Sequence, residues 1–458
     1  MNEVELSKKR VLILGAGKTG LSAANFLIEK AGKVLISEVS NLPKDYENKI
    51  INLKNKGVIF EFNKNSDAFL NQADLIVTSP GISPFTEVIK KINFLNIPVI
   101  SDIELASYFI KKPIIAITGT NGKTTTTHLI SNLITTAGKK AVSCGNIGKP
   151  ILDVISQDAE YYVLEISSYQ IYYSPTFSPA TAVCLNITQD HLDWHKSFEH
   201  YLKSKEKLFL NQKNNSWAIL NYSDNNVKNL NVKNNIFYFT SKNTDTNKFK
   251  TIAFVDNNFL KLKHEGNIYN LINKNDLKII GTHNIENSLA SSAVTCILGI
   301  QLDFIREGLR NFKGVEHRLE LVRKVQNKEF YNDSKATNPE STVKAIEAIK
   351  ENKNNKSITL ILGGRDKNTD LGEMIESINK NIQEIILLGE AKERFLNELR
   401  RVNFSKKIKL VNNINEAVLE SLKSNTEIVL FSPACSSFDM FKNFEERGNV
   451  FKEIITKI

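Results

Sequence analysis

The sequence is poor in the residues that mark exported, zinc-finger or membrane proteins. Its 458 residues include only four cysteines, scattered without a CxxC pair, so neither a disulfide framework nor a cysteine-based zinc site is expected. Near the start, the apolar run from Val11 to Leu14 is too short for a signal-peptide core or a membrane span. We therefore expect a cytoplasmic protein with no membrane partner.

Positive charge is in excess, but it is not concentrated. The 60 lysines and arginines against 50 acidic residues give a net charge of +10 and a pI near 9.1. The lysines alternate with asparagines, as in KENKNNK from Lys350, and not with aromatic residues, so we expect no nucleic-acid partner. Dispersed basic charge instead favours anionic substrates such as nucleotides. The length corresponds to about three globular domains.

Three glycine turns, each preceded by an apolar run and followed by a helical pattern, organise the chain. The runs begin at Val11, Ile114 and Ile358. Strands that alternate with helices predict an α/β fold with parallel sheets. We place the predicted domains at residues 1–112, 113–314 and 315–458, and short polar strands between about residues 211 and 280 predict a small β-rich elaboration of the central domain.

The first turn holds Gly15, Gly17 and Gly20 in a GxGxxG pattern, and Glu38 follows at the distance typical of a ribose-binding carboxylate. Glycines let a pyrophosphate approach the backbone, and the helix that follows adds N–H donors and its dipole. The pyrophosphate of NAD or of UDP would be held by the same physics, and a tight turn without a ligand is a third interpretation. A second loop, Ser79-Pro80-Gly81, could close the same pocket.

The second turn reads GTNGKTTT and follows the apolar run from Ile114 to Ile117. Backbone amides in such a loop can surround phosphates, Lys123 can neutralise the β- and γ-phosphates, and the Thr124 hydroxyl can bind Mg²⁺. The usual pattern GxxxxGK[ST] would need glycine at Ile117, so this shortened variant disfavours a motor protein or a GTPase. The predicted ATP contacts here are Gly119, Thr120, Asn121, Gly122, Lys123, Thr124 and Thr125.

The string GTNGKTT resembles the phosphate loop of the Mur ligases, whose relatives include folylpolyglutamate synthase. The resemblance continues over nearly the whole chain, through LEISSYQ at Leu164, NITQDHLDWH at Asn186, GTHNIENSLA at Gly281 and SPACSSFDMFKNFEERG at Ser432. It implies three domains: a Rossmann-like UDP-binding domain, a central P-loop ATPase-like domain and a Rossmann-like C-terminal domain. It also implies an ATP-dependent amide ligase of cell-wall precursor synthesis that activates a carboxylate as an acyl phosphate.

Charged residues near the phosphate loop are candidates for metal binding. Glu165 ends a predicted strand, and its carboxylate is expected at the sheet edge where Mg²⁺ bound to ATP would lie. Taken alone, His191 would more often be structural and Lys205 a solvated helix lysine. The resemblance implies instead that His191 binds a second Mg²⁺ and that a carbamylated Lys205 supports that ion. Zinc is not expected, because His191 is not part of an HExxH pattern.

The remaining site residues also rest on the resemblance. It places Asn284 and Asn287 near the adenine, Arg318 on the ATP phosphates and Asp333 on the ribose. The implied catalytic set is Lys123, His191, Lys205 and Arg318. Contacts to a substrate, UDP-N-acetylmuramoyl-L-alanine, are implied for Gly17, Lys18, Thr19, Glu38, Ser79, Pro80, Gly81 and Asn146. Contacts to D-glutamate, whose two carboxylates suit ammonium and hydroxyl donors, are implied for Lys335, Thr337, Lys367, Ser437 and Phe444.

Other interpretations remain open. Another ligase of the family, or a folylpolyglutamate-type ligase, would use a different amino acid, although the DNPR motif of diaminopimelate enzymes is absent and the nearest string is ATNPES. An NAD-dependent dehydrogenase would explain only the first glycine loop. A non-catalytic nucleotide-binding regulator would not need Glu165, His191 and the C-terminal residues together. We expect a monomer.

Overall fold

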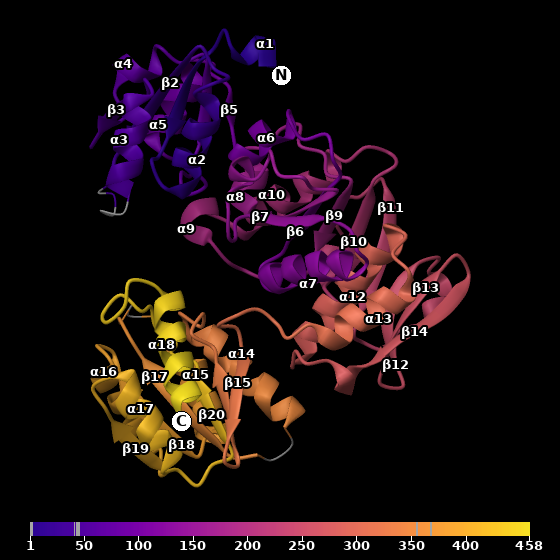
Figure 1. The fold of residues 1–458 in the computed structure, drawn as a ribbon, viewed down its shortest axis with the longest axis vertical. Coiled ribbons are helices and arrows are strands. Elements are labelled where there is room, and N and C mark those ends of the chain that lie inside the picture. Colours follow the sequence, from indigo (N-terminus) through magenta and orange to yellow (C-terminus); the bar gives the residue numbers. More distant parts are fainter. Residues whose placement is uncertain (1–2, 41, 43–45, 354–355, 367–368) are drawn as a thin grey trace. The chain divides into compact units, whose positions relative to one another are not determined.

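Each third of the chain builds its own sheet (Figure 1). The computed structural model describes residues 3–40, 42, 46–353, 356–366 and 369–458. The chain divides into two compact units, one formed by Met1–Asp276 with Glu286–Arg310 and the other by Leu277–Ile285 with Asn311–Ile458. The N-terminal and central sheets belong to the first unit, and the C-terminal sheet belongs to the second.

The N-terminal sheet is parallel and runs in the order β3-β2-β1-β4-β5. Val11 and Ile13 pack into one core and Leu12 and Leu14 into another, so both faces of β1 are covered, which explains its continuous apolar sequence. The elements are α1 (Glu3–Leu6), β1 (Arg10–Leu14), α2 (Lys18–Leu27), β2 (Lys33–Glu38), α3 (Glu47–Asn55), β3 (Ile59–Phe62), α4 (Asp67–Leu70), β4 (Leu75–Thr78), α5 (Glu87–Phe94), β5 (Val99–Ile100) and α6 (Asp102–Ser107).

The central sheet runs in the order β14-β13-β12-β11-β10-β9-β6-β8-β7. Its first elements are β6 (Ile114–Thr118), α7 (Lys123–Thr136), β7 (Ala141–Gly145), β8 (Tyr161–Glu165), α8 (Ser168–Tyr172), β9 (Thr181–Cys184), α9 (Leu192–His195) and α10 (Phe198–Leu210). The rest are β10 (Trp217–Asn221), α11 (Asn225–Lys228), β11 (Asn235–Thr240), β12 (Ile252–Asp256), β13 (Phe259–His264), β14 (Asn267–Asn273), α12 (Thr282–Ile297) and α13 (Leu302–Asn311).

The predicted β-rich elaboration extends this same sheet. Strands β10, β11 and β12 continue the parallel order, and the hairpin of β13 and β14 closes its edge in antiparallel pairing. The short polar strands seen in the sequence are therefore the outer part of the central layer.

The C-terminal sheet runs in the order β15-β16-β20-β17-β18-β19, with only the β15–β16 pair antiparallel among its described pairings. Its elements are β15 (Glu320–Val325), β16 (Lys328–Asn332), α14 (Pro339–Asn352), β17 (Ile358–Gly363), α15 (Gly372–Asn381), β18 (Glu384–Leu388), α16 (Lys392–Arg401), β19 (Lys407–Leu410), α17 (Ile414–Leu422), β20 (Ile428–Phe431) and α18 (Phe444–Lys457). The predicted α/β fold with parallel sheets is confirmed.

Strand order decides where loops meet. Strand β1 lies between β2 and β4, and β6 lies between β8 and β9, so in each sheet the connections leave in opposite directions from a central strand. Ligands of open parallel sheets bind at such points, outside the carboxyl ends of the strands. The first glycine loop follows β1 and the phosphate loop follows β6, so each lies at one of these points.

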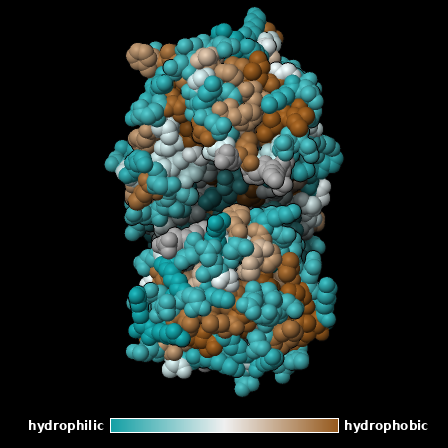
Figure 2. Space-filling view, turned by 90° about the vertical axis from the view of Figure 1, so that its left-hand side faces the viewer, coloured by the Kyte–Doolittle hydropathy of each residue, from teal (hydrophilic) through white to brown (hydrophobic). Residues whose placement is uncertain are grey.

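No described helix is both long and apolar enough to cross a membrane. On the face drawn in Figure 2, hydrophilic residues predominate, and hydrophobic residues are interspersed among them. Scattered apolar residues of this kind are normal on globular proteins.

Candidate active site

The phosphate loop connects β6 to α7 in a conformation that needs glycine. Gly122 has φ +87°, and a Cβ there would come within 2.5 Å of the Asn287 side-chain oxygen. That oxygen accepts a hydrogen bond of 3.1 Å from Thr126, so α12 fixes the start of α7. Lys123 donates to the carbonyls of Gly119 and Thr120, each at 2.8 Å. The loop is thus folded as a phosphate-binding turn, with its ammonium group at the helix N-terminus.

Glu165 lies beside this loop because β8 is the neighbour of β6. One of its carboxylate oxygens accepts a 2.9 Å hydrogen bond from Thr124, and the other accepts a 2.9 Å bond from the amide of Asn146. Glu165 is only 2% exposed. The structure therefore brings together two predicted metal ligands, Thr124 and Glu165, with Asn146 as a third polar group.

Lys205 is buried in the same cluster. It lies on α10 at 1% exposure, and its ammonium group contacts the Thr118 hydroxyl at 3.3 Å and the Gly119 carbonyl at 3.1 Å. Burial, followed by the positive charge of Lys123, lowers the pKa of Lys205 to about 7. Sequence alone favoured a solvated lysine, and that interpretation is wrong, because Lys205 belongs to the buried face of α10 with Tyr201 and Leu208.

His191 precedes α9 in a left-handed conformation, with φ 55°. Its ring lies 4.9 Å from that of Tyr169. Burial lowers the pKa of His191 below its usual value, and the positive charges of Lys123 and Lys205 act in the same direction. The charge of Asp190 opposes this shift. The imidazole is therefore neutral at neutral pH, which is the form that binds metals.

The first glycine loop is tied to Glu38, which is buried at the end of β2. Its carboxylate accepts from the amides of Ala16 and Ser40, both at 2.6 Å. Ser79 approaches the Gly15 carbonyl at 3.3 Å, so the loop after β4 closes on the loop after β1. The structure thus gathers Gly17, Thr19, Glu38, Ser79, Pro80 and Gly81 around the carboxyl ends of β1, β2 and β4. Glu38 thus holds this loop through backbone amides.

Lys18 extends this region toward the central sheet. It donates to the carbonyl of Gly148, in the GNIG loop that also holds Asn146. Since Asn146 donates to Glu165, the loop links the predicted UDP-binding residues with the predicted metal ligands within one unit.

In the second unit, Asp333 follows β16 and lies next to the end of β20. It accepts from the Ser432 hydroxyl at 2.7 Å and from the Leu319 amide at 3.1 Å. Burial raises the pKa of Asp333 to about 7, although these bonds and the charge of Arg318 oppose the rise. The predicted ribose and phosphate contacts, Asp333 and Arg318, therefore lie near each other.

This raised pKa gives a testable pH dependence. Between about pH 4 and pH 7, the folded protein keeps the Asp333 proton and the unfolded chain releases it, so the free energy of unfolding falls as pH rises. We expect Asp333→Asn to lack this fall and to gain stability relative to the unmodified protein across that window. Urea unfolding of the ligand-free proteins at several pH values measures the difference, and exposed Asp370→Asn is the control. If the free energy of unfolding changed with pH in the same way in Asp333→Asn and in the unmodified protein, the raised pKa of Asp333 would be contradicted.

The predicted amino-acid contacts gather after β16 and β20. The Lys335 ammonium lies 3.7 Å from the Phe444 ring centroid. Ser437 is 2% exposed in the loop after β20, and Thr337 is in the loop after β16. Lys367 lies outside the described residues.

Arg447 is a residue of this region that sequence reasoning missed. It is 1% exposed on α18 and donates to the Ser334 hydroxyl, the Ser334 carbonyl and the Cys435 carbonyl at 2.7–3.0 Å. Ser334 in turn donates to the Phe444 carbonyl at 2.9 Å. Arg447 therefore joins the segments that hold the predicted D-glutamate contacts. Its signal in the sequence was helical spacing, because Arg447, Phe451 and Ile455 share one buried face.

The predicted residues thus form two sets. The first unit holds the phosphate loop, Asn146, Glu165, His191, Lys205, Asn287 and the first glycine loop. The second unit holds Asn284, whose side chain donates to the Ile280 carbonyl at 2.7 Å, with Arg318, Asp333, Lys335, Thr337, Ser437 and Phe444.

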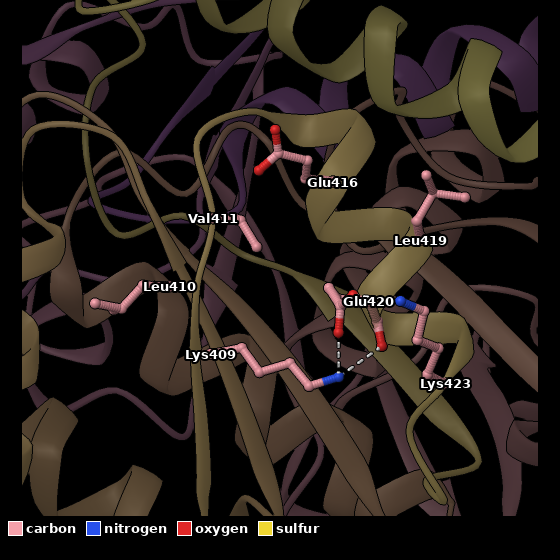
Figure 3. A pocket seen from close by; sticks show the side chains of 7 residues that line it. All are labelled: Lys409, Leu410, Val411, Glu416, Leu419, Glu420 and Lys423. Atoms are coloured by element: carbon pink, nitrogen blue, oxygen red, sulfur yellow. Dashed lines mark hydrogen bonds and ion pairs between the residues drawn. The ribbon is translucent and has the colours of Figure 1, made fainter.

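A depression of about 470 Å³ beside β19 and α17 is separate from these sets (Figure 3). Two of its lysines share one carboxylate, since Lys409 contacts Glu420 at 2.6 Å and Lys423 contacts Glu420 at 2.6 Å. None of the predicted site residues lines it.

Family models match along the chain. They are the N-terminal domain of MurD-like Mur ligases at residues 9–101, the Mur ligase middle domain at 117–295 and the Mur ligase glutamate ligase domain at 317–435. A curated UDP-N-acetylmuramoylalanine--D-glutamate ligase of Thermoanaerobacter pseudethanolicus is 36% identical over 99% of this chain and 100% of its own. That of Caldanaerobacter subterraneus subsp. tengcongensis is 37% identical over 99% of each chain.

Solved structures agree in fold. The UDP-N-acetylmuramate-alanine ligase of Thermotoga maritima has a TM-score of 0.60 at 20% identity, and the match covers 98% of this chain and 99% of that one. Three α/β domains, with a phosphate loop, a carboxylate and a buried lysine at one sheet edge, define a nucleotide-dependent ligase. The chain belongs to the Mur ligase family.

Proposed function

We propose that this protein adds D-glutamate to UDP-N-acetylmuramoyl-L-alanine with consumption of ATP, as a step of peptidoglycan synthesis. The L-alanine carboxylate attacks the γ-phosphorus of ATP; a new O–P bond forms and the bond to ADP breaks. The amine of D-glutamate then attacks the acyl carbon of this acyl phosphate. It loses a proton, phosphate leaves and an amide remains.

The observation that carries this proposal is the cluster at the carboxyl ends of β6 and β8. A phosphate loop, the paired Thr124 and Glu165, and the buried Lys205 meet there. Phosphoryl transfer needs positioning and charge neutralisation around the γ-phosphate, which Lys123 supplies directly. We assign a second cation to Arg318, which belongs to the other unit.

Two Mg²⁺ ions fit the residues present. Among the described residues, no group of three or more His, Cys, Asp or Glu side chains forms a metal site by itself. Mg²⁺ commonly takes one or two carboxylates together with substrate phosphates, so a sparse protein set suits an ion that arrives with ATP. Thr124 and Glu165 would hold one ion, and His191 with a carbamylated Lys205 would hold the other. When bound, the ions neutralise charge on the phosphates.

Carbamylation of Lys205 agrees with its surroundings. With a pKa of about 7, the amine has a substantial neutral fraction at neutral pH. A neutral amine adds to CO₂ to form an N–C bond, and a proton is released. The resulting anion replaces an ammonium group that is buried near Lys123, so repulsion becomes attraction.

We assign the amino-acid site to Lys335, Thr337, Lys367, Ser437 and Phe444. Ammonium and hydroxyl donors suit the two carboxylates of glutamate. Support comes from the curated relatives, whose names specify D-glutamate. We further propose that domains 1–112, 113–314 and 315–458 bind mainly UDP, ATP and the amino acid, and that the protein acts as a cytoplasmic monomer.

Phosphate release tests the proposal. The purified protein, ATP, Mg²⁺ and UDP-N-acetylmuramoyl-L-alanine are combined with D-glutamate, L-glutamate, L-alanine, L-lysine or diaminopimelate in separate reactions. We expect phosphate and the amide product with D-glutamate alone. Turnover with a different amino acid would support a ligase but contradict its proposed specificity for D-glutamate. Lack of turnover with every acceptor would favour a nucleotide-binding regulator.

A further inference from the structure

We propose that Trp194 is a positioning residue that couples binding of the UDP-linked substrate to the placement of His191. The inference rests on the proposed function, which assigns the loop after β4 to that substrate and His191 to a metal ion. Trp194 is absent from both assignments. It is 4% exposed and stands on α9, between the two.

Trp194 is attached to the substrate loop at two points. Its indole N–H donates to the Pro80 carbonyl at 3.1 Å, and its own carbonyl accepts from the Ser83 hydroxyl at 2.7 Å. A third bond of 3.3 Å runs from the Tyr173 hydroxyl to the Ile82 carbonyl. Because these bonds tie the loop to both Trp194 and Tyr173, a shift of the loop by about an ångström would lengthen several of them together.

Trp194 is also part of the turn that holds His191. The amides of Trp194 and His195 both donate to the His191 carbonyl, at 3.1 and 2.9 Å. The rings of Trp194 and Tyr169 stack at a centroid distance of 4.6 Å, and Tyr169 packs against the His191 ring at 4.9 Å. Backbone and side chain of His191 are thus both supported by groups that contact Trp194.

These contacts define a short physical connection from loop to imidazole. A substrate that fixes this loop at Pro80 also fixes the turn that carries His191, and an ion that fixes His191 also fixes the loop. By linkage, each ligand must raise the affinity of the other by the same factor. The indole N–H is specific to this role, since a phenylalanine would fill the same core without it.

The coupling factor can be measured by calorimetry on the full chain. The Kd of UDP-N-acetylmuramoyl-L-alanine is determined with and without Mg²⁺ and a non-hydrolysable ATP analogue. We expect the substrate to bind more tightly in their presence, and Trp194→Phe to reduce that enhancement by about fivefold, the effect of one hydrogen bond. Ser83→Ala, which removes the other bond and leaves the stacked rings intact, should reduce it similarly. Trp217→Phe is the matched control and should leave it unchanged.

Fluorescence gives a second measurement that does not depend on activity. The chain has two tryptophans, so Trp217→Phe leaves Trp194 as the sole indole. We expect its emission to change when the UDP-linked substrate alone is added.

Two results would overturn the coupling and leave the proposed function intact. They are normal substrate binding with the same enhancement in Trp194→Phe, Ser83→Ala and the unmodified protein, or no enhancement in the unmodified protein. A protein that binds no UDP-N-acetylmuramoyl-L-alanine and releases no phosphate would contradict both proposals.

Discussion

Replacement of Lys123 by alanine should lower kcat by about 1000-fold, while the UDP-linked substrate still binds. The ammonium group stands at the N-terminus of α7, held by the carbonyls of Gly119 and Thr120. In phosphoryl transfer, charge shifts onto the oxygens around the γ-phosphorus, and one preorganised donor contributes about 100- to 1000-fold to such a step. We assign the UDP-linked substrate to other residues, so its Kd should stay within about twofold.

Steady-state phosphate release and calorimetry together measure both parts of this prediction. Lys112→Ala is a matched control, because Lys112 is an exposed lysine at the opposite end of β6. Lys123→Arg should remain strongly impaired, since a planar guanidinium does not replace a compact ammonium group in a tight loop. A Lys123→Ala variant within tenfold of the unmodified kcat would contradict the assigned role.

The fold was predictable where sequence carries its own geometry. Buried parallel strands give continuous apolar runs, and glycine turns mark their ends, so the runs beginning at Val11, Ile114 and Ile358 identified a central strand in each sheet. Strand order was not predictable, because it depends on pairing between distant segments. The hairpin of β13 and β14 shows this, since its polar strands suggested an elaboration and gave no indication of which sheet they would extend.

The site was predictable in part, for a related reason. Glu165 could be placed beside the phosphate loop because it ends a strand, and carboxyl ends of neighbouring parallel strands share one edge. Lys205 needed the family resemblance, since burial of a helical lysine depends on what packs over it. Trp194 and Arg447 were not singled out as site residues, because the backbone carbonyls to which they donate lie on distant segments. The helical spacing of Arg447 indicated only a buried face.

Replacement of Lys205 by alanine should also lower kcat by about 1000-fold, and short carboxylates such as acetate should restore part of the activity. The side chain is fully buried beside Thr118 and Gly119, so its removal leaves space at the cluster. An added carboxylate can occupy that space and supply the negative charge that we propose for the carbamate. If Lys205 served only for packing, an added anion would not restore activity. Rescue by acetate therefore distinguishes a role of its charge from a role in packing.

The neighbouring lysine provides the control for this experiment. Lys203 lies on the same helix, is exposed and pairs with Glu199 at 2.7 Å, so Lys203→Ala should keep full activity with or without acetate. In the unmodified protein, NMR with isotope-labelled bicarbonate should show a carbamate signal that grows as pH rises through 7, because CO₂ adds only to the neutral amine and the pKa of Lys205 is about 7. The signal should be missing from Lys205→Ala and retained in Lys203→Ala. Full activity of Lys205→Ala, or a low activity that no short carboxylate raises, would contradict the proposed role of Lys205 as an anion near a second metal ion.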